Sequence, residues 1–478
     1  METSSSLMKN TTIVFIGTIV RMFCSFVLVL IVTRTLGPEG TGVYSVVLSL
    51  FWLFQKIATM GLEPICIREI AKNHSRAGSL VANSTVIGII FSVIMSGCMW
   101  GFTYIATYPG IVRVSAIVMS GTLVFTTGNL FFQAMFIGLE RTELGVSGIV
   151  AENLIRVGAG AALLVSGYSI FSVFIVFLCS SALRLGINLY FTIKFVDGFR
   201  WSYSKEESRF LFKTMPVFAG SQIFNAFSGN ITVIILSLLL GMDAVGYYSV
   251  AMQLVGFIRL ALQSYKSAIQ PVAARIYDKS VRELRKFTKK SLTYLFLFII
   301  PVCFGGVMLS DKIVLLLFSE EFLYSAYLLR YLIFLSCVYG VSMVLSVILI
   351  GSNNQKIDFW GIVLNMSVRI GVVIVLVPRI QVWGAVVAVL VSATAGAFYR
   401  YSYIRRHFFR IPFGTIMYKT VFAAGLMSVC TYALRSIHVA AAVSVSAAVY
   451  LALVLAMKII TPGQIPGVRL LLNRKRAS

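Results

Sequence analysis

The segment Leu36–Val46, which reads LGPEGTGVYSV, decides the fold because it occurs twice. At Leu240–Val250 the chain reads LGMDAVGYYSV, which matches the first copy without a gap at an offset of 204 residues (240 − 36). Six residues are identical in the two copies, and Glu39 meets Asp243. An apolar stretch of helical length lies on each side of both copies. We therefore expect two hydrophobic helical hairpins, each with a Gly-rich turn that carries one acidic residue.

A second pair of segments supports an internal duplication. Six residues between Gly138 and Gly158 recur between Gly351 and Gly371 at an offset of 213 residues (351 − 138). Loop insertions account for the difference between the two offsets. Two matching pairs in the same order predict that the chain consists of a repeated unit.

The composition indicates an integral membrane protein. Hydrophobic residues make up 58% of the 478 residues and charged residues only 12%, against about a quarter in ordinary soluble domains. The net charge of +24 does not favour a nucleic-acid partner, because the basic residues lie between apolar segments. The seven cysteines are scattered and lie mostly inside those segments, which argues against a disulfide framework or a metal site.

Fourteen segments are long and apolar enough to cross a membrane, since a spanning helix needs about 20 mainly apolar residues. They are 12–34, 41–62, 81–105, 111–137, 143–167, 170–195, 212–240, 244–270, 291–310, 324–350, 357–377, 380–404, 414–436 and 438–460. Basic residues concentrate in the loops on the side that holds both termini. Such an asymmetry predicts that both termini are cytoplasmic, which requires an even number of spans.

Six spans separate equivalent points of the repeat, so the two halves enter the membrane in the same direction. Parallel repeats of this kind form transporters with a cavity between two bundles. The predicted fold is an all-α polytopic membrane protein with about 14 transmembrane helices, arranged as two parallel-repeat six-helix lobes plus two C-terminal helices. The predicted boundaries are 1–197 for the N-lobe, 198–211 for a cytoplasmic linker, 212–410 for the C-lobe and 411–478 for the last two spans with a basic tail.

The segment 271–290, PVAARIYDKSVRELRKFTKK, combines a basic composition with one apolar helical face. This pattern predicts a helix that lies on the cytoplasmic leaflet and binds anionic membrane lipid. The alternative is an ordinary solvated basic loop.

Ionisable residues inside spans are costly, and each needs a partner, water or a route to the interface. Arg184, Lys266 and Arg330 lie nearer the span ends, where we expect their side chains to reach the headgroups. The deeper residues form the predicted substrate-binding site, namely Arg21, Lys56, Glu152, Arg156, Arg259 and Arg369.

Arg156 and Arg369 are repeat equivalents, and each has a polar residue four positions earlier, Glu152 and Asn365. These pairs lie on one helix face. One interpretation is a neutralised pair that joins neighbouring helices, and the other is a cationic cavity for an anionic substrate. Arginine suits phosphate, which it binds through paired hydrogen bonds. A cation exporter would place several carboxylates there, whereas Glu152 is the only acidic residue that we assign to the depth of a span.

Enzyme signatures are not found in the sequence. The three histidines are isolated in or near loops, and no ATP-binding module is recognisable. We therefore expect no catalytic residues, no metal and no cofactor, and transport energy from a gradient or from the flux of substrate and product.

Several motifs resemble one family. LGPEGTGVYS, the following MGLEPICIREIA, LGMDAVGYYSVA, QPVAARIY and LFSEEFLYSA at Leu317–Ala326 are similar to polysaccharide transporters, the O-antigen and capsule lipid-linked oligosaccharide flippases of the multidrug/oligosaccharidyl-lipid/polysaccharide exporter superfamily. The resemblance covers most of residues 10–400. It implies two lobes that alternate in access, and cavity-facing basic residues that engage a diphosphate headgroup. The matching candidates are Arg21, Lys56, Arg156, Arg259 and Arg369.

The resemblance implies that the protein moves oligosaccharide units linked to polyprenyl diphosphate from the cytoplasmic to the outer leaflet of the plasma (inner) membrane. Partners would be this anionic substrate, anionic membrane lipid, and the polysaccharide polymerase and glycosyltransferases of the same pathway, with a monomer as the expected state. Alternatives within the fold are a cation-coupled small-molecule exporter and a peptidoglycan-precursor flippase. A polytopic membrane enzyme would carry a large non-cytoplasmic loop, which this sequence lacks, and a structural scaffold has no use for buried arginines.

Overall fold

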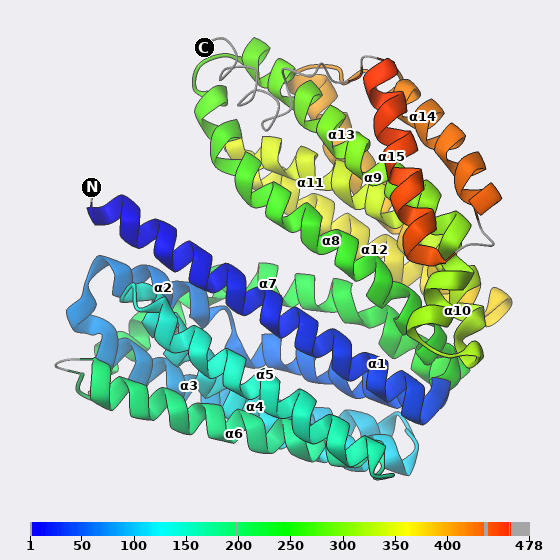
Figure 1. The fold of residues 1–478 in the computed structure, drawn as a ribbon. Coiled ribbons are helices and arrows are strands. Elements are labelled where there is room, and N and C mark those ends of the chain that lie inside the picture. Colours follow the sequence, from blue (N-terminus) through cyan, green and yellow to red (C-terminus); the bar gives the residue numbers. More distant parts are fainter. Residues whose placement is uncertain (1, 197–198, 435–437, 458, 460–478) are drawn as a thin grey trace, which may run out of the picture. The chain divides into compact units, whose positions relative to one another are not determined.

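The computed structural model describes residues 2–196, 199–434, 438–457 and 459, without the side chains of residues 2–11, 217, 221 and 225. The predicted all-α architecture is confirmed, because every element in the described residues is a helix (Figure 1). The α-helices are α1 Glu2–Thr59, α2 Leu62–Lys72, α3 Ala77–Ile105, α4 Gly110–Gly138, α5 Thr142–Val165, α6 Ile170–Phe195, α7 Lys205–Leu240, α8 Met242–Tyr277, α9 Val281–Leu317, α10 Leu323–Leu332, α11 Leu335–Gly351, α12 Gln355–Ile380, α13 Val382–His407, α14 Phe413–Ala433 and α15 Val439–Ala456. Two short 3₁₀ helices, His74–Arg76 and Glu320–Phe322, precede α3 and α10.

Twelve of the described helical segments are long and apolar enough to span a membrane, or 13 if the bent pair Glu320–Leu332 and Leu335–Gly351 counts as one span. The first of them, Thr12–Thr59, contains two of the predicted spans, which meet at Gly37. The predicted span 324–350 corresponds to the bent pair, whose halves meet at 40°. The predicted span is therefore a bent pair of helices, because the chain breaks between α10 and α11.

The repeated stretch forms the same turn twice. Gly37 adopts φ 60° and ψ −163°, and its repeat equivalent Gly241 adopts φ 92° and ψ −175°. This region of backbone conformation is essentially restricted to glycine. The two turns also approach each other reciprocally. A Cβ atom on Gly42 would lie 1.9 Å from the carbonyl oxygen of Met242, and one on Gly246 would lie 2.1 Å from that of Pro38.

The second repeated stretch is equally clear in the backbone. Glu140 and Asn353, which are 213 residues apart, both adopt φ 59° where a span ends in a tight turn. Just before them, Gly138 and Gly351 each let a second helix approach closely. A Cβ atom on Gly138 would lie 2.8 Å from Ile70, and one on Gly351 would lie 3.1 Å from the backbone nitrogen of Ala274. Both halves therefore use the same contacts, and the duplication is structural.

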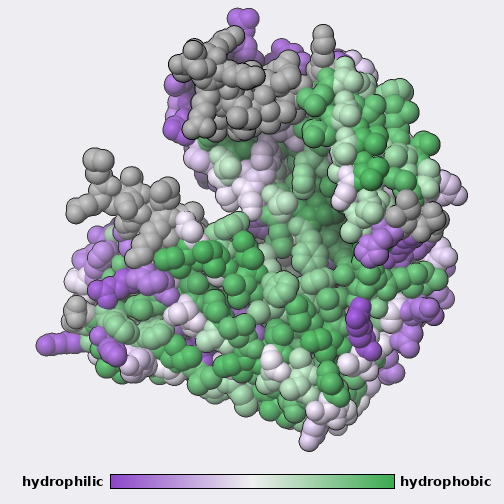
Figure 2. Space-filling model, in the orientation of Figure 1, coloured by the Kyte–Doolittle hydropathy of each residue, from purple (hydrophilic) through white to green (hydrophobic). Residues whose placement is uncertain are grey.

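The chain forms two compact units, Met1–Ser249 and Val250–Ser478. In the first unit a buried apolar cluster joins α2, α3, α4 and the start of α7, and includes Ile65, Leu80 and Phe132. Large apolar side chains are exposed on the outside of the helices, for example Ile105 at 84% and Ile193 at 80%. Figure 2 shows such apolar surface on the helices of each unit. This surface is what a bilayer covers. The predicted lobe boundaries stay predictions.

The basic segment 271–290 is not a separate helix. It contains the last turns of α8, a short turn around Asp278, and the first turns of α9. The predicted apolar face is retained in part, since Leu284 is buried. The basic tail from residue 460 onward lies outside the described residues.

Candidate substrate site

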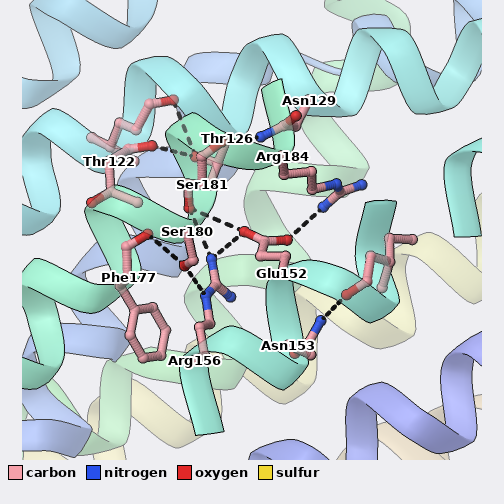
Figure 3. A network of polar contacts seen from close by, with 12 residues as sticks. Thr122, Thr126, Asn129, Glu152, Asn153, Arg156, Phe177, Ser180, Ser181 and Arg184 are labelled. Atoms are coloured by element: carbon pink, nitrogen blue, oxygen red, sulfur yellow. Dashed lines mark hydrogen bonds and ion pairs between the residues drawn. The ribbon is translucent and has the colours of Figure 1, made fainter. Parts of the chain in front are cut away.

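A buried ionic cluster joins α5 and α6 in the first unit (Figure 3). Glu152, only 3% exposed, accepts hydrogen bonds from two arginines, Arg156 on its own helix and Arg184 on α6. The spacing of four residues places Glu152 and Arg156 on one face of α5. Arg184 Nη1 donates to Glu152 Oε2 at 2.9 Å. One carboxylate therefore stands between two guanidinium groups in the interior of an apolar bundle.

Two serines of α6 complete the surroundings of Arg156. Its Nε donates to Ser180 Oγ at 3.1 Å, and its Nη2 donates to Ser181 Oγ at 2.8 Å. The guanidinium carbon also lies 4.3 Å from the ring centroid of Phe177, which gives a cation–π contact. Arg156 is therefore bound by side chains of both α5 and α6, as Figure 3 shows.

Arg184 links this cluster to α4 and to a pocket. Its Nη2 donates to Gln133 Oε1 at 2.9 Å. Gln133 lines a pocket between α1, α4 and α5 together with Arg21 and Thr142. Arg21 interacts electrostatically with both Arg184 and Glu152. The structure thus brings together Arg21, Glu152 and Arg156, three of the six predicted site residues, and adds Arg184 to them.

The second unit contains the corresponding arginine. Arg369, 5% exposed, lies on α12 and donates through Nε to Ser392 Oγ of α13 at 3.2 Å. Its Nη2 donates to Asn365 Oδ1, four residues earlier on the same helix, at 3.2 Å. This geometry repeats that of Arg156 with Ser180 and Glu152. The predicted equivalence of the two arginines is visible in their bonds.

A second buried ion pair lies in the second unit between α12 and α13. Arg400 Nε donates to Asp358 Oδ1 at 2.6 Å, and Arg400 Nη1 donates to Ser342 Oγ of α11 at 3.0 Å. Arg400 is 6% and Asp358 9% exposed. Neither residue is part of the predicted site, because Asp358 lies at the start of the predicted span 357–377 and Arg400 near the end of the predicted span 380–404. The glycine Gly361 is the available signal, since a Cβ there would lie 3.0 Å from the Arg400 guanidinium carbon.

The remaining predicted site residues are more open. Arg259 on α8 is exposed and lies over the ring of Tyr339, with 5.4 Å between the guanidinium carbon and the centroid. Lys56 is half-buried near the end of α1, and its ammonium group has no hydrogen-bond or ion-pair partner among the described residues. Arg21 is exposed as well. Asn225 lies 204 residues after Arg21 (225 − 21) and is therefore its expected equivalent in the repeat, but its side chain lies outside the described part of the chain.

One expectation about a span-end arginine is wrong, and a second such arginine has a partner that the sequence does not reveal. Arg184 does not extend to an interface, because Glu152 and Gln133 hold its side chain at 11% exposure. Arg330 is bound by Asp311 through Nη2, at 2.6 and 2.7 Å from the two carboxylate oxygens. In both cases an acid on a neighbouring helix supplies the partner, which span positions alone do not reveal. Within the described residues no three His, Cys, Asp or Glu side chains are grouped in a way that could hold a metal ion.

Two family profiles match the sequence. The profile described as polysaccharide biosynthesis protein matches residues 7–277, and the profile MatE matches residues 218–375. Among curated relatives, a putative O-antigen transporter of Shigella flexneri is 23% identical over 313 residues, which are 60% of this chain and 71% of the relative. A probable low-salt glycan biosynthesis flippase, Agl15 of Haloferax volcanii, is 22% identical over 403 residues, which are 81% of each chain.

Solved structures show the same fold. The lipid II flippase MurJ in an inward closed conformation superposes with a TM-score of 0.74 at 14% identity, over 93% of this chain and 98% of that one. A multidrug resistance MATE family transporter of the MOP superfamily, in an inward-facing conformation, gives a TM-score of 0.67 at 13% identity, over 81% and 94% of the two chains. At these identities the likeness concerns the fold.

Proposed function

Because the chain belongs to the family of polysaccharide biosynthesis proteins, we propose that it is a flippase for lipid-linked oligosaccharides. It translocates repeat units carried on polyprenyl diphosphate from the cytoplasmic to the outer leaflet of the plasma (inner) membrane, for the synthesis of a surface polysaccharide. Two relatives support this proposal by their names, one an O-antigen transporter and the other a glycan biosynthesis flippase.

The observation that carries the proposal is the charge of the first unit's interior. Arg156 and Arg184 both bind one carboxylate, Glu152, so the group keeps a net positive charge inside an apolar bundle, and the more exposed Arg21 interacts with it electrostatically. Charge in such a place is costly and marks a substrate pathway. A diphosphate is the complementary headgroup, because arginine binds phosphate oxygens through paired hydrogen bonds.

The six proposed site residues divide into two roles. Arg21, Lys56 and Arg259 have the more open side chains and contact the headgroup directly. Glu152, Arg156 and Arg369 are engaged with neighbouring helices and keep those helices in register. The lipid tail stays in the bilayer while the two lobes alternate in access, which is how parallel-repeat transporters work.

The first experiment deletes the gene in its host and measures surface polysaccharide and the sidedness of the lipid-linked units. We expect the polymer to be lost and complete single units to accumulate on the cytoplasmic face. Units that accumulate on the outer face would point to a polymerase and contradict the proposal. Normal polysaccharide with altered tolerance to small cations would favour a cation-coupled exporter. Arrest of cell-wall synthesis would favour a peptidoglycan-precursor flippase.

A second experiment assigns the direct contacts. Arg21→Gln and Arg259→Gln are compared with Arg21→Lys and Arg259→Lys in cells that lack the chromosomal gene. We expect the glutamine variants to lose transport at normal membrane levels and the lysine variants to keep part of it, because lysine keeps the charge without the fork geometry. Lys194→Gln, which alters an exposed cation outside the site, is the control. Full transport in both glutamine variants would contradict the headgroup role.

Anionic membrane lipid is a proposed partner at the start of α9. Arg282, Arg285, Lys286, Lys289 and Lys290 are exposed and recur at helical spacing on one side of α9, and Glu283 pairs with Lys286 alone. Basic clusters next to a span attract anionic headgroups. Replacing all five by Gln should reduce the phosphatidylglycerol retained in mixed phosphatidylglycerol–phosphatidylcholine nanodiscs. Replacing Arg68 and Lys72, which both pair with Glu69, serves as control, and equal retention in all three proteins would contradict this partner.

The proposal also places both termini in the cytoplasm and treats the protein as a monomer that works beside the polymerase and glycosyltransferases of its pathway. Cysteine labelling from each side of sealed vesicles tests the termini. The mass of the protein in detergent tests the monomer.

A further inference from the structure

The polar groups around Glu152 form a ring that is closed except at one place. Ser181 Oγ donates to Glu152 Oε1 at 3.1 Å, and Asn129 Nδ2 donates to the Ser181 carbonyl oxygen at 2.9 Å. Asn188 Nδ2 donates to Asn129 Oδ1 at 2.8 Å, and Arg184 Nη1 returns to Glu152. The ring would close if Asn188 were joined to Arg184, which lies one turn earlier on α6.

The open place is bordered by two buried polar atoms. Arg184 Nε and Asn188 Oδ1 are inaccessible to solvent, and neither has a hydrogen-bond partner among the described residues. Both lie beside Gly148 of α5. A Cβ atom built on Gly148 would be 3.0 Å from Asn188 Oδ1 and 3.9 Å from Arg184 Nε. Buried polar atoms without a partner are rare in native proteins, so this pair requires an explanation.

The orientation of the Asn188 amide is determined by the ring itself. The Ser181 carbonyl oxygen can only accept, so Asn129 must present Nδ2 to it and Oδ1 to Asn188. Asn188 must then donate through Nδ2, which leaves its Oδ1 facing the gap. An exchange of the two amide atoms is therefore excluded by a partner whose role is fixed.

The second unit shows how the corresponding place is filled there. Gly361 is the repeat equivalent of Gly148, and there the larger side chain of Arg400 fills the space above the glycine, with its Nε 3.1 Å from the Cβ position. Arg400 is separated from Ser392 by eight residues, as Asn188 is from Ser180, so Asn188 is the shorter residue at the corresponding position of α6. In the first unit the shorter Asn188 stands above the glycine, and its Oδ1 lies 3.0 Å from the Cβ position.

We propose that one structural water molecule binds above Gly148 and closes the ring. The ligand must accept from the cationic Arg184 Nε–H and donate to Asn188 Oδ1. A metal cation cannot accept the first bond, and an anion cannot donate the second. Water does both, and buried water typically satisfies otherwise unpaired polar groups. By holding Nε, the water keeps Arg184 in the geometry that presents Nη2 to Gln133 and thereby to the pocket of Arg21.

The direct test is a cryo-electron microscopy map of the full chain in lipid nanodiscs at a resolution that shows ordered water. We expect a density peak within hydrogen-bond distance of both Arg184 Nε and Asn188 Oδ1. A direct bond from Arg184 Nε to Asn188 or to another side chain, with no peak above Gly148, would overturn the proposal.

A pair of glycine variants supplies the second test. Gly148→Ala places a methyl group 3.0 Å from Asn188 Oδ1, whereas Gly158→Ala on the same helix meets no atom within 4 Å. Both gain the same helix propensity. We expect Gly148→Ala to remove the density peak and to melt at a lower temperature than Gly158→Ala. Equal melting temperatures, or a peak that persists in Gly148→Ala, would contradict a water site at this position.

Discussion

The helix pair α5–α6 of the first unit and the pair α12–α13 of the second are joined in the same way. Arg156 donates through Nε to Ser180 across the first pair, and Arg369 donates through Nε to Ser392 across the second. The two distances, 3.1 and 3.2 Å, are nearly equal. Each arginine also binds the side chain four residues earlier on its own helix. Both units therefore contain the same interhelix tie, by which we mean an arginine that binds a serine of the next helix and the side chain four residues earlier on its own helix.

The charge around this tie differs between the units. The residue four positions earlier is the acid Glu152 in the first unit and the neutral Asn365 in the second. The first unit compensates with a second arginine, Arg184, while the second unit places its buried acid at Asp358 and pairs it with Arg400. A buried carboxylate requires a cation, so in each unit the buried acid and an arginine occur as a pair, at different positions of the repeat. The arginine–serine hydrogen bond between the helices is common to both units, whereas the buried ion pairs differ between them.

The largest expected effect concerns transport and tests whether the shared tie matters equally in both units. Arg156→Ala and Arg369→Ala should each abolish transport, because each removes the bonds that hold two spans in register. Folded protein should persist, since Glu152 keeps Arg184 in the first variant and Asn365 is neutral in the second. Polysaccharide formation and membrane protein level are measured together. Full activity of both variants at normal expression would show that the tie is dispensable.

The next effect concerns stability and tests the difference in charge. Glu152→Ala leaves two arginines without their carboxylate, and breaking a buried ion pair in this way costs about 3–5 kcal/mol. Asn365→Ala removes one hydrogen bond that the cationic Arg369 donates to a neutral amide, which contributes about 1.5–3 kcal/mol. Thermal unfolding in the same detergent compares the two variants. Equal losses of stability in the two variants would show that Glu152 contributes no more to the stability of the first unit than Asn365 contributes to that of the second.

Packing of the repeated turns should give an effect of intermediate size. Gly42→Ala and Gly246→Ala each push a methyl group against a backbone carbonyl of the other turn. Overpacking of this kind costs about 1–3 kcal/mol, and the reciprocal contacts predict similar losses for the two variants. Gly229→Ala on α7, which meets no atom within 4 Å, is the control. A loss in only one of the two variants would show that the turns do not pack as equivalents.

The smallest expected effect is a coupling energy between two residues. It is measured with a double substitution that gives the first unit the residue pattern of the second. Glu152→Asn combined with Arg184→Ala copies the surroundings of Arg369, whose partner four residues earlier is the neutral Asn365. The double variant should be more stable than Glu152→Asn alone, because the single variant leaves Arg184 buried without its carboxylate and the double variant removes that arginine. Residues in one network typically couple by about 0.5–3 kcal/mol. A double-mutant cycle of melting temperatures measures this coupling, and simple additivity would mean that the two residues do not depend on each other.

The sequence predicted the parts of this structure that repeat in register. Gly37 and Gly241 lie in matching segments and each follows a leucine, so both turns and the helices beside them followed from the alignment. The equivalence of Ser180 and Ser392 could not be predicted from the sequence. The two serines are 212 residues apart (392 − 180), whereas the offset of the second repeated stretch is 213, and a shift of one residue moves a position to another face of the helix. Arg184 was misplaced for a related reason. Its partner Glu152 lies on another helix, and hydrophobicity does not reveal which faces of two apolar helices meet.

The backbone conformation of Gly37 also predicts how the turn would respond to a D-amino acid at this position. Its angles of φ 60° and ψ −163° become −60° and 163° on reflection, which lies in the extended region that ordinary L-residues occupy freely. A D-alanine incorporated at position 37 or 241 would therefore adopt the native backbone without strain, whereas L-alanine would resist it. Semisynthesis with the two mirror-image residues would separate the handedness of this turn from the size of its side chain.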